Sequence, residues 1–153
     1  MALPSGLLRR RKRSSRLGER GFTLIEILVV ITIIGLIMAL VAPRVLNYLS
    51  EAKVKAAKIQ IESLSSTLDL YYLDTGRYPS SSEGLQALVE RPAGVEGWSG
   101  PYLKGGFVPK DPWGHDYAYR MPGEHGAYDI VSYGSDGQQG GTGVAADVTS
   151  WQH

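Results

Sequence analysis

The strongest constraint in this sequence is an apolar run from Phe22 to Ala42, which contains 21 residues and a single formal charge, Glu26. At about 1.5 Å per residue, an α-helix of this length spans roughly 30 Å, the thickness of the hydrocarbon core of a bilayer. A buried helix of a soluble protein is a competing interpretation. The length of the run and the basic segment before it favour a membrane-spanning helix.

The segment before the run is strongly basic. It contains one acidic residue, Glu19, and seven basic residues: Arg9, Arg10, Arg11, Lys12, Arg13, Arg16 and Arg20. Residues 1–21 therefore carry a net charge of +6, and because the whole chain carries +1, residues 22–153 carry −5. Basic residues beside an apolar helix stay on the cytoplasmic side, so the C-terminal part is predicted to lie outside. An acidic folded part argues against nucleic acid as its partner.

A secretory signal peptide is the main alternative for this N-terminal region. Its apolar region is usually about 7 to 15 residues long and is followed by a cleavage site of small residues. Here the run is longer and leads into Pro43-Arg44 and more helix-forming sequence, and the small residues near Ala39 and Ala42 make a poor cleavage site. The sequence therefore favours a retained helix.

The start of the apolar run contains an acidic residue that needs a partner. An unpaired ionised carboxylate at Glu26 would cost roughly several kcal/mol in a membrane. If the chain is cut between Gly21 and Phe22, the new ammonium group could pair with this acid, and the ammonium of a neighbouring subunit would also set the axial register of a filament. An acid near the helix end that reaches the interface by snorkelling is the alternative.

The peptide Arg20-Gly21-Phe22-Thr23-Leu24-Ile25-Glu26 resembles the processing motif of type IV prepilins and type II secretion pseudopilins. The resemblance implies that a membrane peptidase cuts after Gly21 and methylates the new N-terminal Phe22. Pro43 also lies where this family often has a proline.

The helix is predicted to continue beyond Pro43 to Gly76, since Gly76 followed by Pro79 is a typical stop signal. Pro43 lacks an amide proton and is expected to kink the helix or unwind it locally. Apolar residues spaced by three to five positions predict the face on which a globular domain rests. This predicted face contains Val45, Leu49, Ala52, Ala56, Ile59, Leu64, Leu68 and Tyr71.

The part after Gly76 is rich in glycine and proline and predicts short elements. We expect a short amphipathic helix over residues 82–91, capped by one of the serines 80–82, then a loop over 92–106 and a turn at 111–114. Two strands are predicted over 115–121 and 128–133. Five side chains from these strands are predicted to pack on the long helix: Tyr117, Tyr119, Tyr128, Val131 and Tyr133.

The same region resembles the major pseudopilins of type II secretion in detail. The matching motifs are Gly76-Arg77-Tyr78-Pro79, Glu83-Gly84-Leu85-Gln86-Ala87-Leu88, Asp111-Pro112-Trp113-Gly114, the stretch from Asp129 to Gly137, Gly140-Gly141-Thr142-Gly143 and Ala146-Asp147-Val148 with Trp151. Adhesive pilins usually carry a C-terminal cysteine pair, and this chain contains no cysteine.

The resemblance implies an α+β, type IV pilin-like fold. A long N-terminal helix spans the membrane with one half and packs with the other on a small antiparallel sheet, and a glycine-rich C-terminal loop follows. The predicted domains are a cleaved basic leader (1–21), a transmembrane and filament-core helix (22–45) and a periplasmic globular domain (46–153).

The glycine-rich stretch 134–147 is the candidate metal site. It is too polar and flexible to hold one shape by burial, and calcium, which accepts six to eight oxygen ligands in variable geometry, could fix it. From composition alone, an ordinary mobile surface loop is an equal alternative. Resemblance to the major pseudopilins favours calcium and implies Asp136, Asp147 and the carbonyl of Tyr133 as ligands. Some relatives carry an acid in place of Gly143.

No arrangement of residues typical of catalysis stands out. His115, His125 and His153 lack metal-ligand spacing, and the segment around Ser135 is not a nucleophile elbow. An anchored extracytoplasmic enzyme is the alternative to a structural role.

We therefore expect the major structural subunit of a type II secretion pseudopilus, a homopolymer that drives folded proteins through the outer membrane. The resemblance implies further partners: minor pseudopilins, a prepilin peptidase, and an inner-membrane platform with a cytoplasmic ATPase. The chain would cross the bacterial inner membrane once, with its C-terminal domain in the periplasm. A type IV pilin of a surface filament, used for adhesion, motility or DNA uptake, is the alternative.

Overall fold

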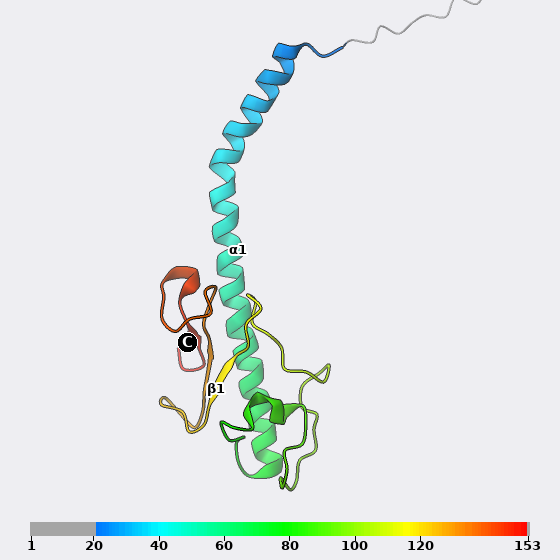
Figure 1. The fold of residues 1–153 in the computed structure, drawn as a ribbon, viewed down its shortest axis with the longest axis vertical. Helices are drawn as coiled ribbons and strands as arrows, with labels where there is room; N and C mark the ends of the chain where they lie inside the picture. The colour runs from blue at the N-terminus through cyan, green and yellow to red at the C-terminus, as the bar shows by residue number, and fades with distance from the viewer. Residues whose placement is uncertain (1–20, 153) are drawn as a thin grey trace, which may run out of the picture. The chain divides into compact units, whose positions relative to one another are not determined.

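A computed structural model describes residues 21–152 of the chain (Figure 1). The predicted leader, apart from Gly21, and His153 lie outside the described residues. The chain divides into two compact units, one ending at Val41 and the other beginning at Ala42.

One helix, α1 (Leu24–Thr75), contains 52 residues and belongs to both units. It contains Pro43 without interruption, so the predicted unwinding at this proline is not observed. At its C-terminal end, Gly76 takes the left-handed conformation, with φ of 74°, and its amide donates to the carbonyl of Tyr72 at 2.8 Å. A residue with a Cβ rarely adopts this conformation, which explains the predicted stop at Gly76.

In the first unit, α1 is apolar on all sides. Within the described residues, α1 is the one helix long and apolar enough to cross a membrane; its most apolar window has a mean hydropathy of 3.0, and no residue in that window is buried. A helix that is hydrophobic all round is stable only in an apolar surrounding, so this half matches the predicted membrane segment in length and composition.

In the second unit, one face of α1 packs against a small sheet and the loops around it. The buried side chains of this face are spaced alternately by four and three residues: Ala57, Ile61, Leu64, Leu68 and Tyr71. Opposite them lie Leu85 and Leu88 from a 3₁₀ helix, η1 (Gly84–Leu88), and Ile130 and Val148 from the sheet. The predicted architecture of a long helix on a small antiparallel sheet is thus confirmed.

The sheet consists of three short antiparallel strands in the order β1-β2-β3: β1 (Ala118–Arg120), β2 (Asp129–Ser132) and β3 (Val148–Thr149). Tyr119 pairs with Ile130, and Val131 pairs with Thr149. The two predicted strands exist but are shorter than expected, and β3 was not predicted because two residues show no alternation. A second 3₁₀ turn, η2 (Gly143–Ala145), precedes β3.

The predicted packing face of α1 is wrong in its first half. Leu64, Leu68 and Tyr71 are buried as predicted, but Val45, Leu49, Ala52 and Ile59 are exposed. Ile59 lies two residues from both Ala57 and Ile61, about 200° around the helix, and therefore on the opposite side. The sequence contains two apolar faces here, and the prediction combined residues from both.

The predicted α-helix over residues 82–91 is also wrong, since only five residues form the 3₁₀ helix η1. Gly84 has a φ of 60°, which interrupts α-helical geometry just after the predicted cap. The N-cap of η1 is Glu83 and not one of the predicted serines, and its side chain makes no capping hydrogen bond to η1. Ser80 is instead joined to Glu83 in the turn before η1. Its amide donates to Glu83 Oε2 at 2.7 Å, and Glu83 N donates to Ser80 Oγ at 3.3 Å.

Three of the five strand side chains predicted to reach the helix do so. Tyr117 is buried and its hydroxyl donates to Gln60 Oε1, Tyr128 donates to the carbonyl of Ser65, and Tyr119 packs against the core. The prediction is wrong for Val131 and Tyr133. They alternate with the buried Ile130 and Ser132 and so lie on the other face of the sheet, where they line a cavity.

A charged network holds the segment that follows α1. Arg77 donates to both carboxylate oxygens of Glu83 at 2.7 Å, and Ser80 donates to the same carboxylate through its amide and hydroxyl. Arg77 is the main cause of the lowered pKa of Glu83, which falls to about 2, with the Ser80 hydrogen bonds adding to the effect and burial opposing it. This ion pair gives the motif around Arg77 a structural role.

We expect Glu83→Gln to lower the free energy of unfolding by about 1–2 kcal/mol at pH 7, the size of a partly exposed bidentate pair after solvent screening. Because folding lowers the pKa of Glu83 from 4.5 to about 2, the contribution is complete above pH 4.5 and is lost as the pH falls towards 2. Thermal melts of the detergent-solubilised chain between pH 7 and 2 measure it. Glu90→Gln, at an exposed position, is the control. If the difference in unfolding free energy between wild type and Glu83→Gln stays the same from pH 7 to pH 2, the stabilising role of the Glu83 carboxylate is contradicted.

Candidate processing site and metal-binding loop

The predicted cleavage site lies immediately before the first turn of α1. Gly21 and Phe22 are exposed and outside the helix, and a Cβ placed on Gly21 would meet no atom within 4 Å. A peptide bond in a non-helical, exposed stretch is accessible to a protease. The structure therefore leaves the Gly21–Phe22 bond accessible, and no packing among residues 21–152 requires a glycine at position 21.

Glu26 and Thr23 form a reciprocal pair of hydrogen bonds at the start of α1. Thr23 N donates to Glu26 Oε2 at 3.4 Å, and Glu26 N donates to Thr23 Oγ1 at 3.3 Å. This is a capping box, which satisfies two amide groups that have no partner within the helix. The predicted partner of Glu26 was a terminal ammonium group; the capping role was missed, although its signature, Thr followed three residues later by Glu, is in the sequence.

The glycine-rich loop folds back on itself between β2 and β3. Ser135 N donates to the carbonyl of Val144 at 3.0 Å, and Gly140 N donates to Asp147 Oδ2 at 2.9 Å. A Cβ on Gly141 would lie 2.3 Å from the carbonyl oxygen of Ala145, so only glycine fits this close approach.

The carboxylate of Asp147 has one oxygen without a partner. Oδ2 accepts the Gly140 amide, whereas Oδ1 is buried and accepts no hydrogen bond from the described residues. A buried carboxylate oxygen without a donor or cation is costly. A calcium ion would supply the missing positive partner, so Asp147 fits the predicted metal.

The other two predicted ligands, Asp136 and Tyr133, have no buried side-chain oxygen that lacks a hydrogen-bond partner among the described residues. Asp136 is exposed, and its Oδ1 accepts the amide of Gln138 at 3.1 Å. Tyr133 lines the same cavity as Asp147 and Gln139, on the outer face of the sheet. Among the described residues no cluster of three or more His, Cys, Asp or Glu could hold a metal, so carbonyl and amide oxygens would have to supply most of a calcium shell.

His115 and Asp111 support this loop, a role that no local pattern in the sequence predicts. His115 Nδ1 lies 3.1 Å from the carbonyl oxygen of Gly134, and its ring lies against Gly137. Asp111 is buried; its Oδ1 accepts the amides of Trp113 and His115, and its Oδ2 accepts the hydroxyl of Ser132 at 2.6 Å. Asp111 thus bonds to β2 through Ser132, and His115 contacts the start of the glycine-rich loop at Gly134.

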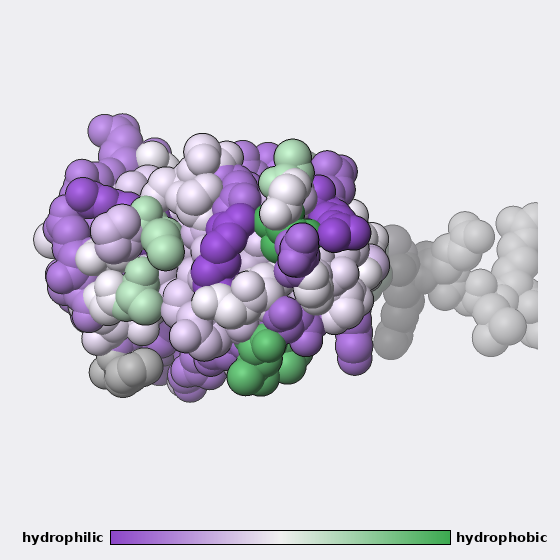
Figure 2. Space-filling view, turned by 90° about the horizontal axis from the view of Figure 1, so that it is seen from below, coloured by the Kyte–Doolittle hydropathy of each residue, from purple (hydrophilic) through white to green (hydrophobic). Residues whose placement is uncertain are grey.

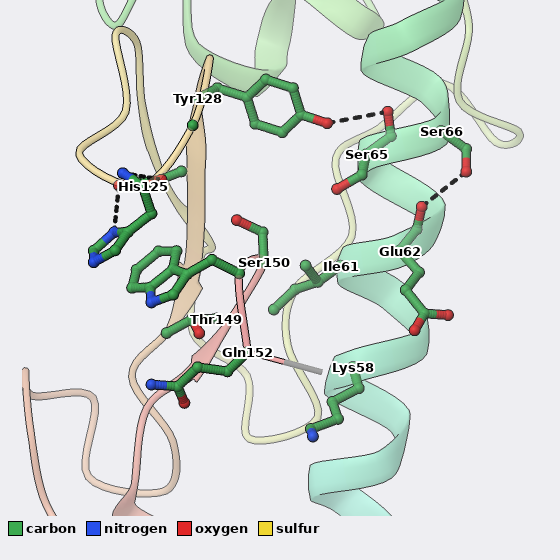
Figure 3. Close-up of a pocket in the computed structure, with 13 residues that line it drawn as sticks. Lys58, Ile61, Glu62, Ser65, Ser66, His125, Tyr128, Thr149, Ser150 and Gln152 are labelled. Atoms are coloured by element: carbon green, nitrogen blue, oxygen red, sulfur yellow. Dashed lines mark hydrogen bonds and ion pairs between the residues drawn. The ribbon is translucent and has the colours of Figure 1, made fainter.

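The C-terminal segment is attached at the other end of the sheet. His125 stacks on Trp151 with ring centroids 3.8 Å apart, and its Nδ1 lies 3.1 Å from Asp129 Oδ2. Burial would raise the pKa of Asp129, but hydrogen bonds from the amides of Glu124 and His125 and from the His125 ring outweigh it and hold the pKa below its usual value. A cavity of about 680 Å³ is lined by His125, Asp129 and Trp151 and by Lys58 and Ile61 of α1. Figure 3 shows His125 on one side of this cavity and Lys58 and Ile61 on the side of α1.

Together these features define a membrane-anchored pilin-like subunit: an apolar helix with an exposed, non-helical start, continued into a helix that carries a small sheet and a glycine-rich loop. Residues 16–42 match the family described as the prokaryotic N-terminal methylation motif. Residues 44–151 match the family described as "Type II secretion system (T2SS), protein G". The chain belongs to this protein G family, whose members are major pseudopilins.

Curated relatives support the assignment over nearly the whole chain. The type II secretion system core protein G of Pseudomonas aeruginosa is 44% identical over 139 residues, which cover 88% of this chain and 96% of the relative. That of Vibrio cholerae is 41% identical over 136 residues, covering 87% and 92%.

A solved structure of a pseudopilin is similar to this chain in both fold and sequence. The major pseudopilin from the type 2 secretion system of enterohaemorrhagic Escherichia coli matches with a TM-score of 0.59 and 34% identity, over 67% of this chain and 85% of that one. The chain is therefore a structural subunit of the pseudopilus and not an enzyme.

Proposed function

We propose that this chain polymerises into a short periplasmic fibre that drives folded proteins through the outer membrane. The observation that carries the proposal is the match to protein G relatives along both the anchor and the folded unit. The basic segment before α1 supports an orientation with residues 46–153 in the periplasm and the helix in the inner membrane. Minor pseudopilins, a prepilin peptidase and an ATPase-driven platform are the partners that such a fibre requires.

Calcium binding to the loop of residues 134–147 is part of this proposal. Asp147 would contribute the unpartnered Oδ1, Asp136 a second carboxylate and Tyr133 its carbonyl oxygen. The ion would neutralise acidic groups and fix a loop that contains little apolar packing of its own.

Deletion of the gene tests the role. We expect exoproteins to accumulate in the periplasm, since the fibre is the proposed driver of export, and we expect surface motility and DNA uptake to be unaffected. Fractionation of the culture measures the first, and plating assays measure the second. Normal secretion with lost motility would instead assign the chain to a surface pilus.

Processing is tested at Gly21. Gly21→Ala should leave the precursor uncut, because a Cβ on the residue before the scissile bond would obstruct the peptidase, while α1 still inserts. Mass spectrometry should find methylated Phe22 at the N-terminus of the wild type and of Gly35→Ala, but not of Gly21→Ala. Gly35→Ala is a matched control, because a Cβ there also meets no atom within 4 Å. A processed, methylated Gly21→Ala protein would refute the site.

The proposed pairing of Glu26 with the N-terminus of a neighbouring subunit predicts a specific defect. Glu26→Ala should insert and be processed normally but form at least tenfold fewer fibres, counted by immunoblot of sheared material. Thr23→Ala removes the hydroxyl half of the capping box but keeps the acid, and it separates the two roles. If Thr23→Ala assembles as poorly as Glu26→Ala, the capping box rather than intersubunit pairing explains the defect; normal fibres from Glu26→Ala would exclude the pairing altogether.

Calcium should raise the melting temperature of the solubilised full chain, because an ion bound only by the folded state stabilises it. Asp147→Asn should abolish most of the shift, while Asp116→Asn, at an exposed aspartate outside the loop, should keep it. A wild-type melt that is identical with calcium and with a chelator would count against the site.

A further inference from the structure

The glycine-rich loop of residues 134–147 is attached to the rest of the folded unit by very few contacts. Residues 135–144 are exposed, and within the described part of the chain no loop residue belongs to the core cluster. Figure 2 shows one face of this unit, whose surface is mostly hydrophilic or neutral with small apolar patches. A surface loop without apolar burial keeps its conformational freedom unless polar contacts fix it.

One side chain from outside the loop supplies such a contact. His115 Nδ1 lies 3.1 Å from the carbonyl oxygen of Gly134, and within residues 21–152 no other hydrogen bond joins the loop to a residue outside it. A carbonyl oxygen can only accept, so Nδ1 carries a proton and donates it. The hydrogen bond can therefore form with the neutral and with the charged imidazole alike.

The His115 ring contacts the loop on both sides of Asp136. On one side it binds Gly134, which directly follows Tyr133 in the chain. On the other side it lies against Gly137, where an added Cβ would be 3.2 Å from Nε2 of the ring. Two of the proposed calcium ligands, Asp136 and Tyr133, are therefore next in sequence to a glycine that the ring contacts.

The two ends of the loop meet at the first of these glycines. A Cβ placed on Gly134 would lie 2.9 Å from the carbonyl oxygen of Ala146, the residue before Asp147. Beside it, Ser135 N donates to the carbonyl oxygen of Val144 at 3.0 Å. A contact that fixes Gly134 therefore also limits where Asp147, the third proposed ligand, can lie.

His115 is itself fixed by the turn that precedes it. Its amide donates to Asp111 Oδ1 at 2.8 Å, and its carbonyl oxygen accepts the amide of Asp111 at 2.8 Å. The Asp111 carboxylate is buried, and its other oxygen accepts the hydroxyl of Ser132 in β2 at 2.6 Å. The imidazole thus projects from a turn that is bonded to the sheet, and its main chain is held without help from the loop.

We propose that His115 is a positioning residue for the calcium site, and that its hydrogen bond to Gly134 holds the loop in the shape that the ion requires. His115 does not bind the ion itself. When this hydrogen bond is removed, the loop loses more conformational freedom on binding, so the affinity for calcium falls. The inference rests on the proposed binding of calcium to residues 134–147, and it names the side chain outside the loop that sets the affinity.

Three substitutions of His115 test this role in the detergent-solubilised full-length chain, with calcium affinity measured by isothermal titration calorimetry. His115→Asn places an amide nitrogen as many bonds from the main chain as Nδ1 is, so it should keep the hydrogen bond and most of the affinity. His115→Gln carries the same amide one bond further out, and His115→Phe keeps a ring without a donor. Both should bind calcium about tenfold more weakly, the usual effect of losing a group that orients metal ligands.

Thermal melts separate positioning from general stability. The His115 side chain is 39% exposed, so all three variants should fold. Calcium should raise the melting temperature of wild type and His115→Asn strongly, and that of His115→Gln and His115→Phe only weakly. A residue that only stabilised the fold would instead lower the melting temperature equally with calcium and with a chelator.

The outcomes separate the role of His115 from the calcium site itself. Equal calcium affinity in wild type, His115→Gln and His115→Phe would overturn the positioning role and leave the site in place. An equal loss in His115→Asn and His115→Gln would overturn it too, because the position of the donor would then not matter. If His115→Phe does not fold, the comparison of the two amides decides. If the wild type binds no calcium, the proposed site fails, and the role of His115 fails with it.

Discussion

The packing of one face of α1 against the sheet is the interaction on which the folded unit depends. The three strands contain nine residues in all, too few to form a stable sheet alone. Ile130 is fully buried because Leu64 and Leu68 of the helix supply the apolar surface that the sheet lacks. Helix and sheet therefore stabilise one another, and the loops between them are held by polar contacts at their ends.

Those polar contacts share one design, in which a side chain accepts or donates several hydrogen bonds at the base of a loop. Glu83 does so in the segment after α1, and Asp111 does so at the turn before β1. Asp129, the first residue of β2, does so for the loop between β1 and β2. Each loop is rich in glycine or proline and offers little apolar surface to bury. Charge-assisted hydrogen bonds replace that burial. In the loop at 134–147, Asp147 has the corresponding position, but one of its oxygens has no partner among the described residues. This oxygen is the observation that supports the proposed calcium ion.

Much of the fold was predictable because its main signals are local. The membrane helix follows from length and hydropathy, the end of α1 follows from Gly76, and the family resemblance follows from contiguous motifs. The inner face of α1 was only partly predictable, because Ile59 and Ile61 are chemically equivalent and only tertiary contacts decide which is buried. The two residues of β3 carry no pattern, and the role of His115 depends on a carbonyl group 19 residues away. The capping box at Thr23 and Glu26 was predictable, because a threonine followed three residues later by a glutamate is its sequence signature.

The two apolar faces of α1 have a consequence for how this chain can vary. Each residue added to a helix turns everything after it by about 100°. An insertion or deletion of one residue between Ala57 and Leu68 would therefore turn Leu68 and Tyr71 out of the core and, in the same step, move the exposed Leu70 and Leu73 to another side of the helix. Loops elsewhere can change length without such effects. The length of this helix is thus fixed twice, once by folding and once by whatever covers its outer side.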